Sequence, residues 1–187
     1  MKASRLLAGI GTFAALMLCT FSVAHASEVV RFKMVPASAT IARCLPDATA
    51  EVTVFLKEEQ GSLGVDTFQL KASGLAANTA FAVFLTELSA FDTPPADEQQ
   101  FGAVEYIGDF TTNAAGQGSL KVDAIIEEAF SFSSQRVRKE LNNVIFWFAD
   151  PKNDDACFAP GTGPITPFDG DREAGAAAMS SQNAPLP

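Results

Sequence analysis

Short segments of alternating apolar and polar residues, separated by turn residues, recur along most of this 187-residue chain. In residues 51–57, Val52, Val54 and Leu56 share one face, because alternate side chains of a strand point the same way. Further strands are predicted at residues 28–35, 39–43, 66–73, 79–88, 104–110 and 144–149. Residues 113–118 predict a hairpin turn that leads into another strand. The pattern predicts an all-β fold, an antiparallel sandwich of about seven to nine strands.

Two of these segments, residues 79–88 and 144–149, are almost continuously apolar. Strands buried on both faces have this composition, so both are expected in the middle of a sheet, with Trp147 in the core. The segment ends at Asp150-Pro151, a sequence that does not continue a central strand.

One segment, residues 125–141, departs from the period of two. Its apolar positions have helix-like spacing: Ile126, Phe130, Val137 and Leu141. This spacing predicts one short helix. The basic cluster of Arg136, Arg138 and Lys139 would lie on its solvent face, where it could dock an acidic partner.

The first 26 residues read as a secretory signal peptide. Lys2 and Arg5 precede an apolar stretch at residues 6–18, and Ala24-His25-Ala26 fits a small-x-small cleavage site. An uncleaved membrane anchor is the alternative, because weakly polar residues extend the apolar stretch to Val23. Cleavage predicts a secreted or periplasmic protein that has lost Cys19 and its only histidine, His25.

Two cysteines, Cys44 and Cys157, remain after cleavage. In an exported protein such a pair predicts a disulfide, and only one pairing exists. The bridge would tie the second predicted strand to the segment that follows the last one. Closing so long a loop would stabilise the fold by up to about 4–5 kcal/mol.

The chain is acidic, with 22 Asp and Glu against 13 Lys and Arg. Loss of Lys2 and Arg5 would change the net charge from −9 to −11. A surface of this sign repels phosphate backbones and anionic lipids, so no nucleic-acid partner and no membrane association after cleavage are predicted.

The predicted domain organisation is a signal peptide at residues 1–26, a β-sandwich at 27–158 and a tail at 159–187. The tail is rich in Pro, Gly and Ala. It is expected to be extended along the surface or disordered, especially after Asp171.

Residues 74–81, Gly-Leu-Ala-Ala-Asn-Thr-Ala-Phe, resemble the strand-to-strand corner of fibronectin type III domains, which are immunoglobulin-like sandwiches. The resemblance implies that Leu75 closes the edge of the sandwich and that Asn78 occupies the turn. Phe81 replaces the tyrosine of that corner, so the hydrogen bond of the tyrosine hydroxyl cannot form.

The chain after residue 26 also resembles uncharacterised secreted bacterial proteins. The shared patterns are Tyr106-Ile107-Gly108-Asp109-Phe110-Thr111-Thr112 and Trp147-Phe148-Ala149-Asp150-Pro151. This resemblance implies a common sandwich and no known chemistry.

The acidic residues near the C-terminus are the candidate metal ligands. Calcium takes six to eight oxygen ligands, which such a segment could supply. The candidate residues are Asp150, Asp154, Asp155, Asp169 and Asp171. The spacing of an EF-hand loop is absent, and a solvated turn is the simpler interpretation.

The sequence predicts no enzyme, because without histidine the usual base for serine or cysteine hydrolysis is missing. The predicted function is a non-catalytic exported protein that binds a protein or small-molecule ligand, or that contributes to the cell surface. Loops at residues 91–101 and 150–169 are the expected contact surfaces. The alternatives are a carboxylate-dependent hydrolase and a calcium-stabilised adhesion-type module.

Overall fold

The structure, a computed structural model, describes residues 28–57, 65–91, 101–133, 135–167 and 173–187. It confirms the predicted all-β antiparallel class. The main sheet has eight strands in the order β5-β4-β9-β12-β1-β2-β3-β6. These are β1 (Val29–Pro36), β2 (Thr49–Phe55), β3 (Asp66–Ser73), β4 (Ala80–Thr86), β5 (Val104–Thr111), β6 (Gly118–Ala124), β9 (Asn143–Phe148) and β12 (Ala177–Ser180).

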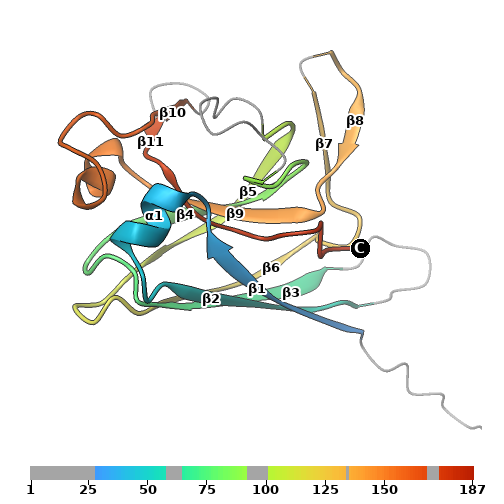
Figure 1. Ribbon diagram of the computed structural model, residues 1–187. Helices are drawn as coiled ribbons and strands as arrows, with labels where there is room; N and C mark the ends of the chain where they lie inside the picture. The colour runs from blue at the N-terminus through green and yellow to red at the C-terminus, as the bar shows by residue number, and fades with distance from the viewer. Residues whose placement is uncertain (1–27, 58–64, 92–100, 134, 168–172) are drawn as a thin grey trace, which may run out of the picture.

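The main sheet folds over on itself into two layers (Figure 1). β2, β3 and β6 lie in one layer, and β4, β5 and β9 lie in the other (Figure 1). β1 connects the layers: its first part pairs with β2, whereas Val35 and Pro36 pair with Ser180 and Met179 of β12. The end strands β5 and β6 are joined by a short turn, so the sheet almost closes.

The main core lies between the two layers. β3 buries alternate residues, including Phe68 and Leu70, as expected for a strand with one face inward. In the other layer, Phe81 of β4 lies 5.3 Å from Phe110 and 5.4 Å from Phe146, measured between ring centroids. Aromatic pairs at these separations add to the stabilisation that area burial provides.

A second apolar cluster covers the outer face of β4 and β9. Trp147 packs edge-on against Phe84 and Phe101, with ring centroids 5.2 Å apart in both pairs. All six residues of β9 are therefore buried. Burial on both faces explains why residues 79–88 and 144–149 are almost continuously apolar, and it confirms their prediction as central strands.

The predicted strand at residues 39–43 is wrong, because this segment forms the helix α1 (Ala39–Cys44). The Ser38 hydroxyl accepts a hydrogen bond from the Ile41 amide at 3.2 Å and caps the helix. Ile41 is fully buried. A short apolar segment fits either period, and here the cap decides the outcome.

The short helix predicted within residues 125–141 is also wrong. The segment forms a hairpin of β7 (Phe130–Phe132) and β8 (Arg138–Glu140), paired from Phe130 with Glu140 to Phe132 with Arg138. Ile126 and Leu141 are buried at its base, whereas Phe130 and Val137 are exposed. The helix-like spacing therefore does not mark one buried face.

The C-terminal segment does not form the expected extended or disordered tail. β12 inserts between β9 and β1, and Ala178 and Met179 are fully buried. Ser181 is buried too, and its hydroxyl accepts a hydrogen bond from the Val144 amide at 3.0 Å. Residues 173–187 are thus part of the same folded unit as β1 to β9. The small β10 (Thr166–Pro167) pairs with β11 (Glu173–Ala174) just before β12.

The disulfide joins Cys44 and Cys157, as the sequence predicts. Cys44 ends α1, and Cys157 follows the 3₁₀ helix η2 (Pro151–Ala156). The bridge therefore connects two short helical segments, and the expected link to a second strand is wrong because residues 39–43 are helical.

Candidate binding groove

The two ends of the main sheet, β5 and β6, meet near their connecting turn and then separate. No hydrogen-bonded pairing between them occurs among the residues that the structure describes. They are close at Gly118, where an added Cβ would lie 2.5 Å from Phe110 Cδ2, and at Gly108, where it would lie 3.1 Å from Leu120 Cδ1. Gly108 has a φ of 155°, a backbone conformation that favours glycine, and any side chain added there would have to displace the Leu120 side chain.

A β-bulge in β5 lies at the point where the strands diverge. Val83 is paired with Gly108, but the next residue, Phe84, is paired with Tyr106, which leaves Ile107 unmatched. An extra residue bends its strand and increases the local twist. The bulge therefore directs residues 104–106 away from β6.

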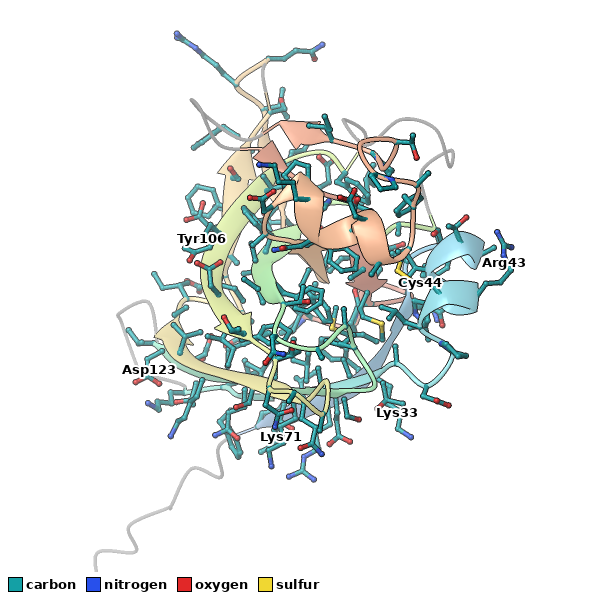
Figure 2. All side chains as sticks on the ribbon, turned by 90° about the vertical axis from the view of Figure 1, so that its left-hand side faces the viewer. Lys33, Arg43, Cys44, Lys71, Tyr106 and Asp123 are labelled. Atoms are coloured by element: carbon teal, nitrogen blue, oxygen red, sulfur yellow. A yellow bond between two sulfur atoms is a disulfide. The ribbon has the colours of Figure 1, made fainter. Side chains whose placement is uncertain are left out.

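A groove occupies the space between the separated strands, with a volume of about 450 Å³. Ligand pockets in proteins commonly have volumes of this order. Three groups of residues line it: Glu105, Tyr106 and Ile107 of β5; Val122, Asp123 and Ala124 of β6; and Ile125, Glu128, Ala129 and Phe130 beyond β6. We call this feature the edge groove. Figure 2 labels Tyr106 and Asp123, which mark its two sides on the same side of the molecule.

The edge groove combines exposed apolar surface with negative charge. Tyr106 is 51% exposed, and Ile125 and Phe130 are each 40% exposed. Three of its lining residues are acidic, namely Glu105, Asp123 and Glu128, and none is basic. An apolar surface bordered by one sign of charge favours ligands that carry both apolar groups and the opposite charge.

Hydrogen bonds, one within β5 and one from β3 to β6, hold two of the polar groups in place. The Tyr106 hydroxyl donates a hydrogen bond to Asp109 Oδ2 at 2.7 Å. The Thr67 hydroxyl donates to Asp123 Oδ1, also at 2.7 Å. These bonds reduce the conformational freedom that a ligand would otherwise have to remove on binding.

The β7–β8 hairpin forms one wall of the edge groove through Phe130 and projects beyond the two layers (Figure 1). Lys139 anchors it, with Nζ 2.6 Å from Glu87 Oε1. Desolvation raises the pKa of Glu87, but the hydrogen bond from Lys139, the Ala103 amide and the Lys139 charge outweigh it. The pKa of Glu87 is therefore lower than its ordinary value.

The basic cluster lies on this hairpin and not on a helix. The Arg138 guanidinium lies 4.1 Å from the centre of the Phe130 ring and also pairs with Glu140 at 3.0 Å. Arg136 lies in the turn with a φ of 61°. The three basic residues therefore have different environments. Lys139 pairs with Glu87, Arg138 packs on the Phe130 ring, and Arg136 is exposed at the tip of the hairpin.

Three of the five candidate calcium ligands, Asp150, Asp154 and Asp155, lie in the described part of the chain, and each accepts a hydrogen bond from a different backbone amide. Asp150 Oδ1 caps η2 by accepting from the Lys152 amide, and Asp155 Oδ1 accepts from the Gly161 amide. Asp154 is buried and accepts from the Ala176 amide through Oδ2. No group of three or more possible metal-ligating acids, cysteines or histidines occurs in the described part of the chain. The remaining candidates, Asp169 and Asp171, lie outside that part.

Asp154 has an unusual environment. Its Oδ1 atom is buried without a hydrogen-bond partner among the described residues. A Cβ added at Gly163 would collide with this oxygen, so the backbone passes directly beside it. Burial raises the pKa of Asp154, the Ala176 amide opposes this, and the Asp155 charge raises it further; the net pKa is above the ordinary value.

The sequence did not indicate the edge groove. It favoured loops at residues 91–101 and 150–169, of which residues 92–100 and 168–169 lie outside the described residues. The available signal was the exposed side of residues 104–107 and 122–130, where Tyr106, Ile125 and Phe130 face solvent. Only the meeting of two sheet ends makes these residues one surface.

Comparisons with family models, with curated proteins and with solved structures find no match to this chain. Among the described residues, no helix has the length and apolar character needed to cross a membrane. The signal peptide predicted at residues 1–26 lies outside those residues.

Proposed function

We propose that this chain is an exported, non-catalytic binding protein and that its ligand occupies the edge groove. The observation that carries the proposal is the groove itself, in which anchored aromatic and aliphatic side chains remain exposed beside three carboxylates. Apolar patches of this kind on soluble proteins commonly mark interaction sites.

Export is supported by the signal-like residues 1–26 and by the Cys44–Cys157 disulfide. Disulfides persist in oxidising compartments such as the periplasm or the cell exterior. The protein would therefore act outside the cytoplasm, either secreted or periplasmic.

A carboxylate-dependent hydrolase is the second candidate, because Glu105, Asp123 and Glu128 line the same groove. Such an enzyme needs one carboxyl group with a raised pKa to donate a proton. Burial in an apolar pocket provides such a group in known glycosidases, whereas Glu105, Asp123 and Glu128 are all exposed. We therefore favour binding over catalysis.

A calcium-stabilised adhesion module remains the third candidate. It requires oxygen ligands that converge, whereas Asp150, Asp154 and Asp155 bind separate backbone amides. A rise in melting temperature in millimolar calcium would support this candidate over the first.

The proposal is tested by locating ligand binding on the isotope-labelled protein that begins at Ser27. A library of small organic fragments and short peptides is screened, and NMR shift changes are mapped on the backbone amides. We expect hits to cluster at residues 104–107 and 122–130. Ile125→Lys should abolish them, whereas Phe91→Lys, at a residue 49% exposed outside the groove, should not. Hits confined to other surfaces would contradict the proposal.

A further inference from the structure

We propose that the occupant of the edge groove is an extended cationic segment of a partner protein, which adds to β6 as a further strand. This inference rests on the proposed function and specifies its ligand. It follows from the outer edge of β6, from the charge of the groove and from its apolar walls.

β6 offers the more regular edge. It pairs with β3 without interruption from Gly118 to Ala124. β5 lies against Gly118 and Leu120, but residues 122–124 face the groove, and no described strand is hydrogen-bonded to their outer side. β5 is interrupted by the bulge at Ile107. Since a bulge disrupts the hydrogen-bond ladder, an incoming strand would pair with β6 rather than with β5. It would lie in the groove between β6 and the diverging part of β5.

The groove supplies alternating environments along that edge. Val122 and Ala124 are partly buried and point toward the core, whereas Asp123 between them is exposed. A paired strand alternates in the same way, with one set of side chains inward and the other outward. Its inward residues would contact Tyr106, Ile125 and Phe130.

The negative charge of the groove determines which outward side chains of the partner strand are favoured. Glu105, Asp123 and Glu128 border the groove without a basic lining residue, and the whole chain has a net charge of −9. This field attracts basic segments and repels acidic ones, which favours an alternating basic and apolar sequence.

The test uses capped peptides that alternate Lys with Val, Leu, Phe or Tyr, added to the protein that begins at Ser27. We expect binding with shift changes along residues 122–125, and weaker binding as salt is raised. Glu-for-Lys peptides should not bind. Peptides N-methylated at every interior amide keep their charge but cannot pair as strands, so they should lose binding.

Matched variants separate the contribution of charge from that of folding. The triple variant Glu105→Gln/Asp123→Asn/Glu128→Gln should weaken binding about tenfold, because each rim contact contributes modestly. Glu51→Gln, an exposed acid on β2 outside the groove, should leave affinity unchanged.

The outcomes distinguish this inference from the proposed function. Equal binding of N-methylated peptides, or fragment hits in the groove without any peptide binding, would overturn strand addition and leave the proposed function intact. The protein could instead self-associate through the groove, with the exposed Arg136 of a second copy as the basic group. If Arg136→Glu abolished such self-association, a second copy would be the occupant and the inference would be overturned. The absence of any groove ligand would overturn both.

Discussion

At the scale of single residues, Thr112 shows how the corner at residues 74–81 is held without a tyrosine. Thr112 Oγ1 donates to the Ala76 carbonyl at 2.6 Å and accepts from the Thr79 amide at 2.9 Å. Leu75 is buried beside it, and Asn78 has a φ of 52°. Asn78 therefore lies in a turn, as the sequence predicts, and the buried Thr112 hydroxyl just after β5 ties this turn to the sheet.

Thr112→Val is therefore expected to destabilise the protein by about 1–3 kcal/mol. The change keeps the shape of the side chain but removes the hydrogen-bond partner of the buried Thr79 amide and of the partly buried Ala76 carbonyl. Urea denaturation of the variant and of Thr111→Val, the exposed neighbour, measures the difference. Equal stabilities would show that the hydroxyl does not hold the corner.

Asp154 gives the chain a stability that depends on pH. Because its folded pKa is raised, the folded state binds the proton more tightly than the unfolded state does. The contribution of Asp154 is therefore most favourable below the ordinary value of 3.8, and it is lost as pH rises through the folded pKa.

Asp154→Asn should remove this dependence. Relative to the unsubstituted protein, the variant should gain stability as pH rises from about 3 to about 7, because asparagine has no carboxyl group to lose a proton in this range. Denaturation at both pH values measures the change, with Asp47→Asn, an exposed acid, as the control. A difference that stays constant with pH would contradict the assignment.

At the scale of elements, the sequence identifies strands whose own pattern is decisive. Val52 and Val54 alternate with polar residues, and residues 144–149 are apolar throughout; both became strands in the predicted environments. The wrong predictions concern segments whose structure depends on contacts with strands that are distant in the sequence. The Ala-rich residues 176–181 look like a tail by composition, but small side chains fit between β9 and β1 when those edges supply the hydrogen bonds.

The edge groove belongs to the same class of failure. No local sequence pattern predicts the bulge at Ile107. Tyr106 and Asp123 line the same groove only because of the order of the strands in the sheet. The disulfide was predictable because two cysteines permit one pairing, whereas a groove between two sheet ends requires the topology.

Met179→Ala tests whether β12 is an integral strand. Met179 is fully buried, so the substitution should destabilise the protein by about 2–5 kcal/mol. Gln182→Ala, at an exposed residue of the same segment, should change stability by less than about 0.5 kcal/mol. Thermal and urea denaturation measure both, and a neutral Met179→Ala would restore the interpretation of residues 173–187 as a loose tail.

At the scale of the whole molecule, the disulfide links two distant parts of the chain. Cys44 and Cys157 are separated by 113 positions, and Figure 2 labels Cys44 beside the C-terminal turn of α1. The bridge restricts the unfolded chain over most of the folded unit, and long loops gain most from such closure.

Replacing both cysteines, as Cys44→Ala/Cys157→Ala, should lower the free energy of unfolding by about 2–5 kcal/mol. Urea denaturation measures the loss. The unsubstituted protein in excess dithiothreitol provides the control, because reduction should reproduce most of the effect. Identical midpoints for oxidised, reduced and substituted proteins would show that the bridge contributes nothing.

The position of β12 also determines when folding can finish. The sheet is continuous only through residues 177–180, which join strands made early in the chain to β9. A polypeptide that crosses a membrane in order, N-terminus first, would keep the edges of β1 and β9 open until β12 emerged. For the exported protein that we propose, the main sheet would stay incomplete during translocation, and folding would finish only on the far side of the membrane.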